Sequence, residues 1–236
     1  MIYHHINRDG NGVFIAYLTA AIIIFIAVKI AEFTLPTPTV RMIRYSEIIL
    51  NTVMAVWIYL TYGMAKPRSR ENLIALALLI TCGADFFLTL NGGGSMFTPG
   101  VTLFCAVECV YMIYLKPDKI NLIIRAALFA SLIVIARFLG LLTVGIALGV
   151  LNIALLAANM IAAWMIYRNN RDKISFLFAL GMTLFLICDI NVGLEVIAAE
   201  GTAVYNIAYF TVWTVYIPAQ VLIVTNYYQK IRKIQA

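Results

Sequence analysis

The chain alternates long apolar runs with short polar breaks, and this alternation limits its fold more than any other feature. The hydrocarbon core of a bilayer is about 30 Å thick, and about 20 apolar residues in an α-helix cross it. Runs of this length recur throughout the 236 residues, of which 63% are hydrophobic and 12% are charged. A soluble domain usually carries about 25% charged residues. The pattern therefore predicts an all-α, polytopic integral membrane helical bundle.

About eight transmembrane helices are expected, because Pro, Gly or clustered charges interrupt the apolar sequence between the runs. The expected spans are residues 13–31, 43–64, 72–90, 99–115, 120–139, 141–167, 174–198 and 203–228. The polar start, MIYHHINRDGNG, is expected to precede the first helix, and the basic KIRKIQA to follow the last. Asn91 to Gly94 is expected to form a turn, and Pro218 to kink the last helix.

Basic residues orient the predicted bundle. Cytoplasmic loops of membrane proteins are enriched in Lys and Arg. The breaks after the even-numbered runs hold most of them, whereas the opposite loops are expected to hold Arg41, Arg44 and Arg137. Both termini are therefore predicted to be cytoplasmic, in a bacterial inner membrane or an internal eukaryotic membrane. The net charge of +6 follows from this topology, so we expect the lipid bilayer as a partner and no nucleic acid.

A weak internal periodicity suggests a duplication within a single transmembrane domain. Asp85 precedes Tyr111 by 26 residues, and Asp189 precedes Tyr216 by 27. We therefore include the hypothesis of a parallel repeat of two four-helix halves, at about residues 13–116 and 120–228.

Three carboxylates inside apolar runs are the candidate catalytic groups: Asp85, Glu108 and Asp189. A charged side chain at the centre of a membrane helix costs roughly 2.5–3.5 kcal/mol on insertion scales, so such residues are usually functional. A helix rises 1.5 Å per residue, which puts Asp85 and Asp189 about 20 Å from the cytoplasmic starts of their helices. Glu108 runs the other way and reaches a similar depth, so one shared cavity is expected.

Other polar side chains in the spans are expected to bind substrate. They are Asn51, Asn152, Asn159, Asn191, Tyr111, Tyr209, Tyr216 and Gln220. Each also has a structural interpretation, because membrane Asn residues often bond between helices and Tyr residues often anchor helix ends. Arg125 and Arg137 are expected at the two ends of the fifth span, with Arg137 reaching the headgroups. For Glu47, a place near the outer surface is as plausible as a polar site.

Neither a metal nor a cofactor is expected. The only histidines, His4 and His5, precede the predicted spans, which argues against a zinc site built on several His ligands. No Lys lies near the middle of the last apolar runs, so a retinal Schiff base of the rhodopsin kind has no attachment point.

Several short motifs resemble those of the YhhN-like lysoplasmalogenase family. They are GADFFL at Gly83–Leu88, then FTPGVTLFCAVECVYMIY, then FALGMTLFLICDI around Asp189, and YFTVWTVYIPAQVLI with Tyr216 and Gln220. The chain departs from that family at Gly83-Ala84-Asp85, where the family has adjacent Gly-Asp. Glu108 stands in place of a usual His, and Cys188 in place of a Ser.

The resemblance implies hydrolysis of the vinyl ether bond of lysoplasmalogens, which are lysophospholipids, to a fatty aldehyde and a glycerophospho-alcohol. This chemistry needs a general acid, a carboxylate to stabilise positive charge and a base for water. We therefore assign Asp85 and Asp189 as the acid–base pair and Glu108 as the group that orients water or tunes the pair.

Three alternatives remain open from the sequence. Intramembrane acids also serve proton-coupled transporters or binding proteins for lipids and small molecules, although no inverted repeat is visible. A second alternative is a lipid amidase or esterase; an intramembrane aspartyl protease is disfavoured because Gly-x-Gly-Asp is absent. A third is a structural membrane protein whose polar core pairs its helices.

Overall fold

The computed structural model describes residues 2–90 and 96–235, and within them the chain forms eight α-helices and no β-strand. Each of these helices is long and apolar enough to cross a membrane, so the described chain is an all-α, multi-pass bundle. The helices are α1 (Ile2–Thr34), α2 (Thr37–Thr61), α3 (Asn72–Asp85), α4 (Phe97–Leu115), α5 (Lys119–Phe138), α6 (Val144–Asn170), α7 (Lys173–Ile197) and α8 (Ala203–Gln235). The predicted turn at residues 92–94 lies outside the described residues.

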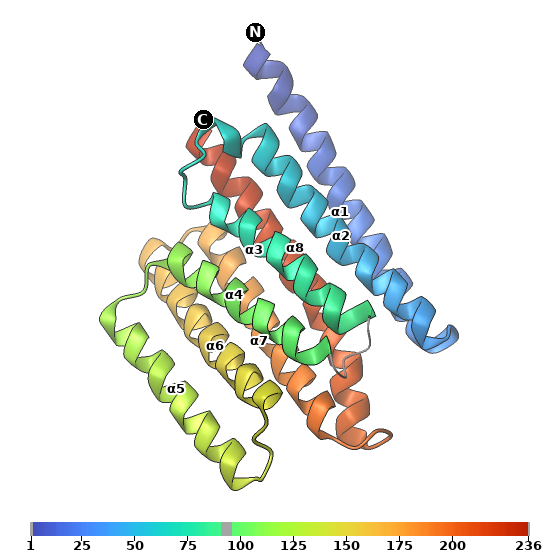
Figure 1. Cartoon of the computed structure of the whole chain (residues 1–236). Helices are drawn as coiled ribbons and strands as arrows, with labels where there is room; N and C mark the ends of the chain where they lie inside the picture. The colour runs from blue at the N-terminus through green and yellow to red at the C-terminus, as the bar shows by residue number, and fades with distance from the viewer. Residues whose placement is uncertain (1, 91–95, 236) are drawn as a thin grey trace.

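Six of the described helices pack into a closed ring in the order α2, α3, α4, α6, α7 and α8, with α8 returning to α2. Helix α1 lies against α2 and α8 on the outside of the ring, and α5 lies against α6 at the opposite edge (Figure 1). Chain order and spatial order therefore differ, because α4 packs on α6 rather than on α5. The ring helices supply all the predicted site residues.

Local sequence explains where several helices begin and end. Asp118, Thr143 and Asp172 each stand just before a helix and accept a hydrogen bond from a backbone N–H of its first turn, at 2.8–3.2 Å. Such N-caps satisfy an amide that has no partner within the helix. At the other ends, Lys116 and Arg171 adopt the left-handed conformation that terminates α4 and α6.

Three helix boundaries lie well outside the predicted spans. Helix α1 begins at Ile2 and includes His4 and His5, and α8 continues through the basic segment to Gln235. Helix α2 begins at Thr37, with Pro38 in its first turn. Hydropathy locates where a helix enters lipid, but backbone hydrogen bonding continues until a residue breaks it, so the helices overrun their apolar runs. Pro218 lies inside α8, and the kink there stays a prediction.

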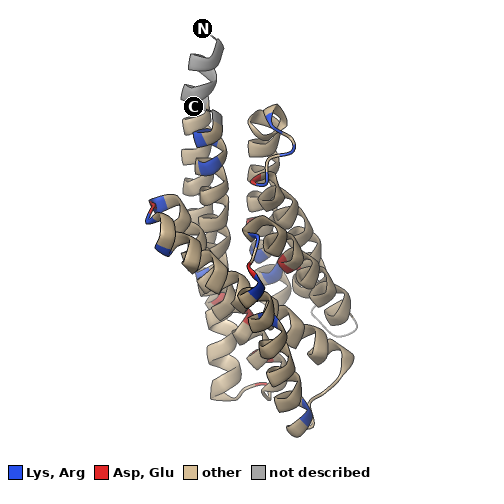
Figure 2. Ribbon diagram, turned by 90° about the vertical axis from the view of Figure 1, so that its left-hand side faces the viewer, with Lys and Arg blue, Asp and Glu red and all other residues tan. Residues whose placement is uncertain are grey.

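Both termini lie at the same end of the bundle (Figure 1). Lys and Arg residues lie near this end and also farther along the bundle (Figure 2); the positive-inside rule predicts that such residues are enriched on the cytoplasmic side. The cytoplasmic orientation itself stays a prediction. The placement of Arg41 and Arg44 in a loop was wrong, because both lie within α2. Because α2 begins earlier than predicted, both arginines lie within the helix. Arg44 is also buried.

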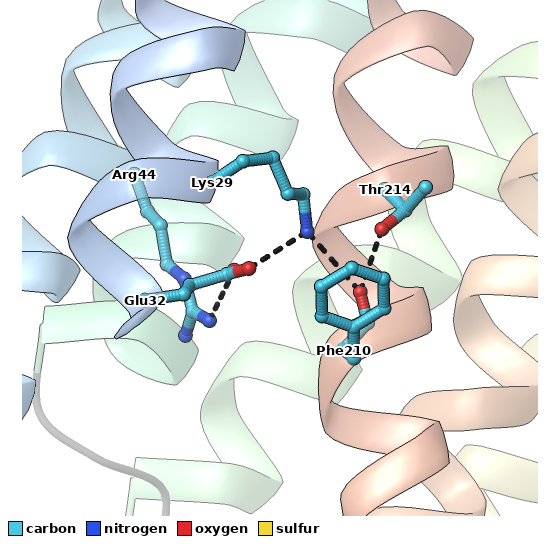
Figure 3. Close-up of polar contacts among 5 residues, drawn as sticks. All are labelled: Lys29, Glu32, Arg44, Phe210 and Thr214. Atoms are coloured by element: carbon cyan, nitrogen blue, oxygen red, sulfur yellow. Dashed lines mark hydrogen bonds and ion pairs between the residues drawn. The ribbon is translucent and has the colours of Figure 1, made fainter. Parts of the chain in front are cut away.

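Glu32 joins α1 to its neighbours near the other end of the bundle. Its carboxylate accepts from Arg44 on α2 at 2.7 Å and from Lys29, one turn away on α1, at 2.8 Å (Figure 3). Lys29 also donates to the carbonyl of Phe210 on α8 at 3.2 Å (Figure 3). The Arg44 guanidinium stacks over the rings of Tyr209 and Trp213, at 4.6 and 5.0 Å. This cluster therefore fixes α1, α2 and α8 relative to one another.

Gly181 permits the close approach of α7 and α8. A Cβ atom there would lie 3.0 Å from Ile223 Cγ1 and 3.2 Å from the carbonyl oxygen of Ala219, a backbone atom. We expect Gly181→Val to lower the melting temperature by several degrees, since overpacking costs about 1–3 kcal/mol. Thermal unfolding in detergent measures this effect. Gly149→Val on α6 is the control, because nothing lies within 4 Å of that position; equal losses in both variants would contradict the close-packing argument.

Candidate active site

The three intramembrane acids lie on three different helices of the ring. Asp85 is the last residue of α3, Glu108 lies in the interior of α4, and Asp189 lies in α7. Asp85 and Glu108 are buried, at 5% and 0% exposure, whereas Asp189 is half-buried. The three acids therefore come from three helices of one ring.

Asp85 stands where α3 changes its winding. Residues Phe86–Leu90 continue the helix as a π-helical turn, a distortion that often occurs at functional sites. The hydroxyl of Tyr216, on α8, donates a short hydrogen bond to Asp85 Oδ2. Tyr216 is itself buried and stacks edge-on against Trp213 and Phe185. Packing of the Tyr216 ring thus fixes the hydroxyl that orients the Asp85 carboxyl group.

Asp189 is held by an amide from the neighbouring helix. Asn152 Nδ2, on α6, donates to Asp189 Oδ2 at 2.6 Å. The other amide atom, Asn152 Oδ1, is buried without a hydrogen-bond partner. Since buried polar atoms are usually paired, this oxygen is available to a water molecule or a substrate hydroxyl.

Glu108 is held by a chain of polar contacts that crosses three helices. Asn159 Nδ2, on α6, donates to Glu108 Oε2 at 2.7 Å and to the Glu108 carbonyl at 3.0 Å. Asn159 Oδ1 in turn accepts from Arg125 Nη2, on α5, at 2.7 Å. These contacts assign the amide orientation of Asn159, because its oxygen faces a cation and its nitrogen faces a carboxylate. Glu108 Oε1 has no partner and is buried.

Arg125 is a buried cation, and the other two nitrogens of its guanidinium group also donate hydrogen bonds. Its Nε donates to Asn121 Oδ1 at 2.9 Å, and its Nη1 donates to the carbonyl of Leu155 at 3.1 Å. Asn121 completes the contact between α5 and α6 by donating to the Ala158 carbonyl at 2.9 Å. The expectation that Arg125 marks an end of the fifth span was therefore wrong. The side chain turns inward because α6, a helix of the ring, offers it two acceptors, and Asn121 on its own helix supplies the third.

A second buried polar group lies between α1, α2 and α8. Tyr17 donates to Asn51 Oδ1 at 2.7 Å, and Asn51 faces Glu47 Oε1 at 3.4 Å. Of the two places that the sequence left open for Glu47, the structure gives the polar site, since its side chain is 0% exposed. Gln220 is buried with both amide atoms unpaired, and it lines a narrow void together with Asn51 and Tyr216. This group therefore adjoins the Tyr216 side of the acid site.

The other predicted substrate-binding residues do not hydrogen-bond to the acids. Tyr111 is fully buried, and its hydroxyl has no partner. Tyr209 lies beneath Arg44 near the end of the bundle. Asn191 donates to the carbonyl of Ile187, one turn back in its own helix, at 2.7 Å. Their roles in substrate binding stay predictions.

The sequence reading missed Arg125 and Arg44 as members of polar networks, and left the place of Glu47 open. The spacing of these residues along each helix could have indicated that their side chains lie together. Arg44, Glu47 and Asn51 are three and four residues apart on α2, and Asn121 and Arg125 are four apart on α5. Such spacings place side chains on one helical face. In the described residues, no three His, Cys, Asp or Glu side chains lie close enough together to hold one metal ion.

Comparison with known proteins gives a match at the level of the family. The model of the YhhN family matches residues 42–227, which reach from the first part of α2 to the last part of α8. No curated protein and no solved structure matches the chain.

Proposed function

Because the chain belongs to the YhhN family, we propose that it is a membrane-embedded hydrolase of lysoplasmalogens. It cleaves the vinyl ether bond and releases a fatty aldehyde and a glycerophospho-alcohol. The observation that carries the proposal is the presence of three carboxylates on helices of the ring, each held by a polar side chain from another helix. A lipid whose chain already lies in the bilayer reaches such a group without leaving the membrane.

The proposed hydrolysis has three steps, and the carboxyl groups of the site can carry out each of them. A carboxylic acid of the Asp85–Asp189 pair protonates the alkene carbon that is not bonded to oxygen, which leaves an oxocarbenium ion. The second carboxylate of the pair stabilises this cation and removes a proton from the water that attacks it. The resulting hemiacetal loses the glycerol oxygen as an alcohol, with return of a proton, and becomes the aldehyde. One water is consumed, and no oxidation occurs.

Each acid has a partner that supports its role. Tyr216 and Asn152 hold Asp85 and Asp189 by one oxygen each. Within the described residues, Glu108 Oε1 and Asn152 Oδ1 have no hydrogen-bond partner, and Asn152 adjoins Asp189 through its own hydrogen bond. These two oxygens suit the binding and orientation of the attacking water. Because a water molecule held in this way is already in position, the reaction step avoids the entropy cost of bringing water to the cation.

A product assay tests the proposal. Purified protein in detergent receives a lysoplasmalogen or, separately, an acyl lysophospholipid of the same headgroup, and mass spectrometry identifies the products. We expect fatty aldehyde from the first lipid and no fatty acid from the second. Fatty acid from the second would indicate an esterase. No product from either, together with pH-dependent uptake into proteoliposomes, would assign the acids to transport.

A further inference from the structure

The outward face of α6 carries a groove of about 530 Å³, away from the three acids. The part of the groove farthest from the C-terminal end of α6 is lined by Met160, Ile161 and Met165, which are apolar side chains on successive turns. Trp164 and Tyr167 follow toward the end of the helix. Trp164 is fixed by a 2.9 Å hydrogen bond from its Nε1 to Thr183 on α7. The groove is thus attached to a rigid part of the bundle.

Arg168 and Arg171 line the groove at the C-terminal end of α6, which lies toward the end of the bundle that holds both termini. Both are exposed, and neither has an ion-pair partner in the described part of the chain. Their neighbour Asp172 does not neutralise them by contact, because its two oxygens accept from the backbone N–H and the hydroxyl of Ser175, at 3.0 and 2.7 Å. Partial burial raises the pKa of the Asp172 carboxyl, but the hydrogen bonds from Ser175 lower it by a larger amount. The pKa of Asp172 therefore lies below its ordinary value.

The order of side chains along the groove matches the layers of a phospholipid. From Met160 to Arg171 the helix rises about 16 Å, at 1.5 Å per residue. Over this distance the lining changes from aliphatic, through aromatic, to cationic. Acyl chains, the glycerol region and the phosphate follow one another in the same order in a leaflet, where Trp and Tyr occupy the interface. Basic pockets beside membrane helices bind anionic headgroups.

We propose that this groove binds an anionic phospholipid of the leaflet at the end of the bundle that holds both termini. The site is separate from the acids, because Asn152 and Arg168 are 16 residues apart on α6, a rise of about 24 Å. The phosphate and the vinyl ether of one lysoplasmalogen are separated only by its glycerol unit. A lipid held by Arg168 and Arg171 therefore cannot present its ether bond to Asp189.

Binding is measured on the full-length protein in detergent by titration with phosphatidylglycerol or phosphatidylcholine, followed by native mass spectrometry and thermal unfolding. We expect phosphatidylglycerol to bind about thirtyfold more tightly, since each basic residue near an anionic lipid contributes about a fivefold factor. Phosphatidylglycerol should also raise the melting temperature by a few degrees, because it binds only the folded protein. Equal affinity for the two lipids would overturn the proposal.

The variant Arg168→Gln/Arg171→Gln should reduce this preference to about threefold or less. Its matched control is Arg68→Gln/Arg70→Gln, which removes two exposed arginines at the turn between α2 and α3 and should keep the preference. An unchanged preference in the Arg168/Arg171 variant would refute the site. A change from dimer to monomer in that variant would instead assign the groove to a second copy of the chain. These measurements require no substrate turnover, so they stand apart from the proposed hydrolysis.

Discussion

Asp189→Asn is expected to lower aldehyde release by about 10²–10⁴-fold, the contribution typical of a general acid or base. Asparagine has nearly the same shape and can still accept the hydrogen bond from Asn152, so the variant should remain folded. Asp85→Asn should have an effect of similar size, because its amide oxygen can still accept from Tyr216. Turnover of lysoplasmalogen, followed by the appearance of aldehyde, measures both effects.

Two controls separate a chemical effect from a structural one. Melting temperatures should stay close to that of the unchanged protein in both variants. Glu195→Gln makes the same change of charge six residues beyond Asp189 on α7 and should retain turnover. Retained turnover in Asp85→Asn or Asp189→Asn would remove that residue from the acid–base pair. A large loss of thermal stability would mean that the carboxylate serves the fold.

Asn159→Leu is expected to cause the largest loss of stability. The substitution removes the acceptor of Arg125 Nη2 and the donor to Glu108 at once. Breaking a buried charged network from one side costs about 3–5 kcal/mol. For a chain of this size that cost corresponds to a fall in melting temperature on the order of 10 °C. Activity should fall as well, because Glu108 loses the bond that fixes its carboxylate.

Further variants test whether Asn159 acts through the network. Arg125→Met and Asn159→Leu should be less than additive when combined, since the double variant removes the same contacts. Asn206→Leu replaces an exposed Asn on α8 and should change the melting temperature little. Independent, additive losses from Arg125→Met and Asn159→Leu would show that the two residues stabilise the bundle separately.

The sequence already determined the membrane class and the number of spans, and it predicts the approximate depth of the acids. Hydropathy and the rise per residue are local properties, so they do not depend on which helices become neighbours. The family resemblance read from the motifs around Asp85, Asp189 and Tyr216 is confirmed by the match over residues 42–227. The parallel four-helix repeat stays a prediction.

Only the tertiary structure decided which partner holds each acid. Tyr216 reaches Asp85, Asn152 reaches Asp189, and Asn159 links Glu108 to Arg125. These pairings depend on the rotation of each helix and on the order of helices around the ring. Both are set by side-chain packing between segments as far as 131 residues apart. A hydropathy pattern contains no such pairwise information, which is why the burial of Glu47 and Arg125 could not be read from the chain alone.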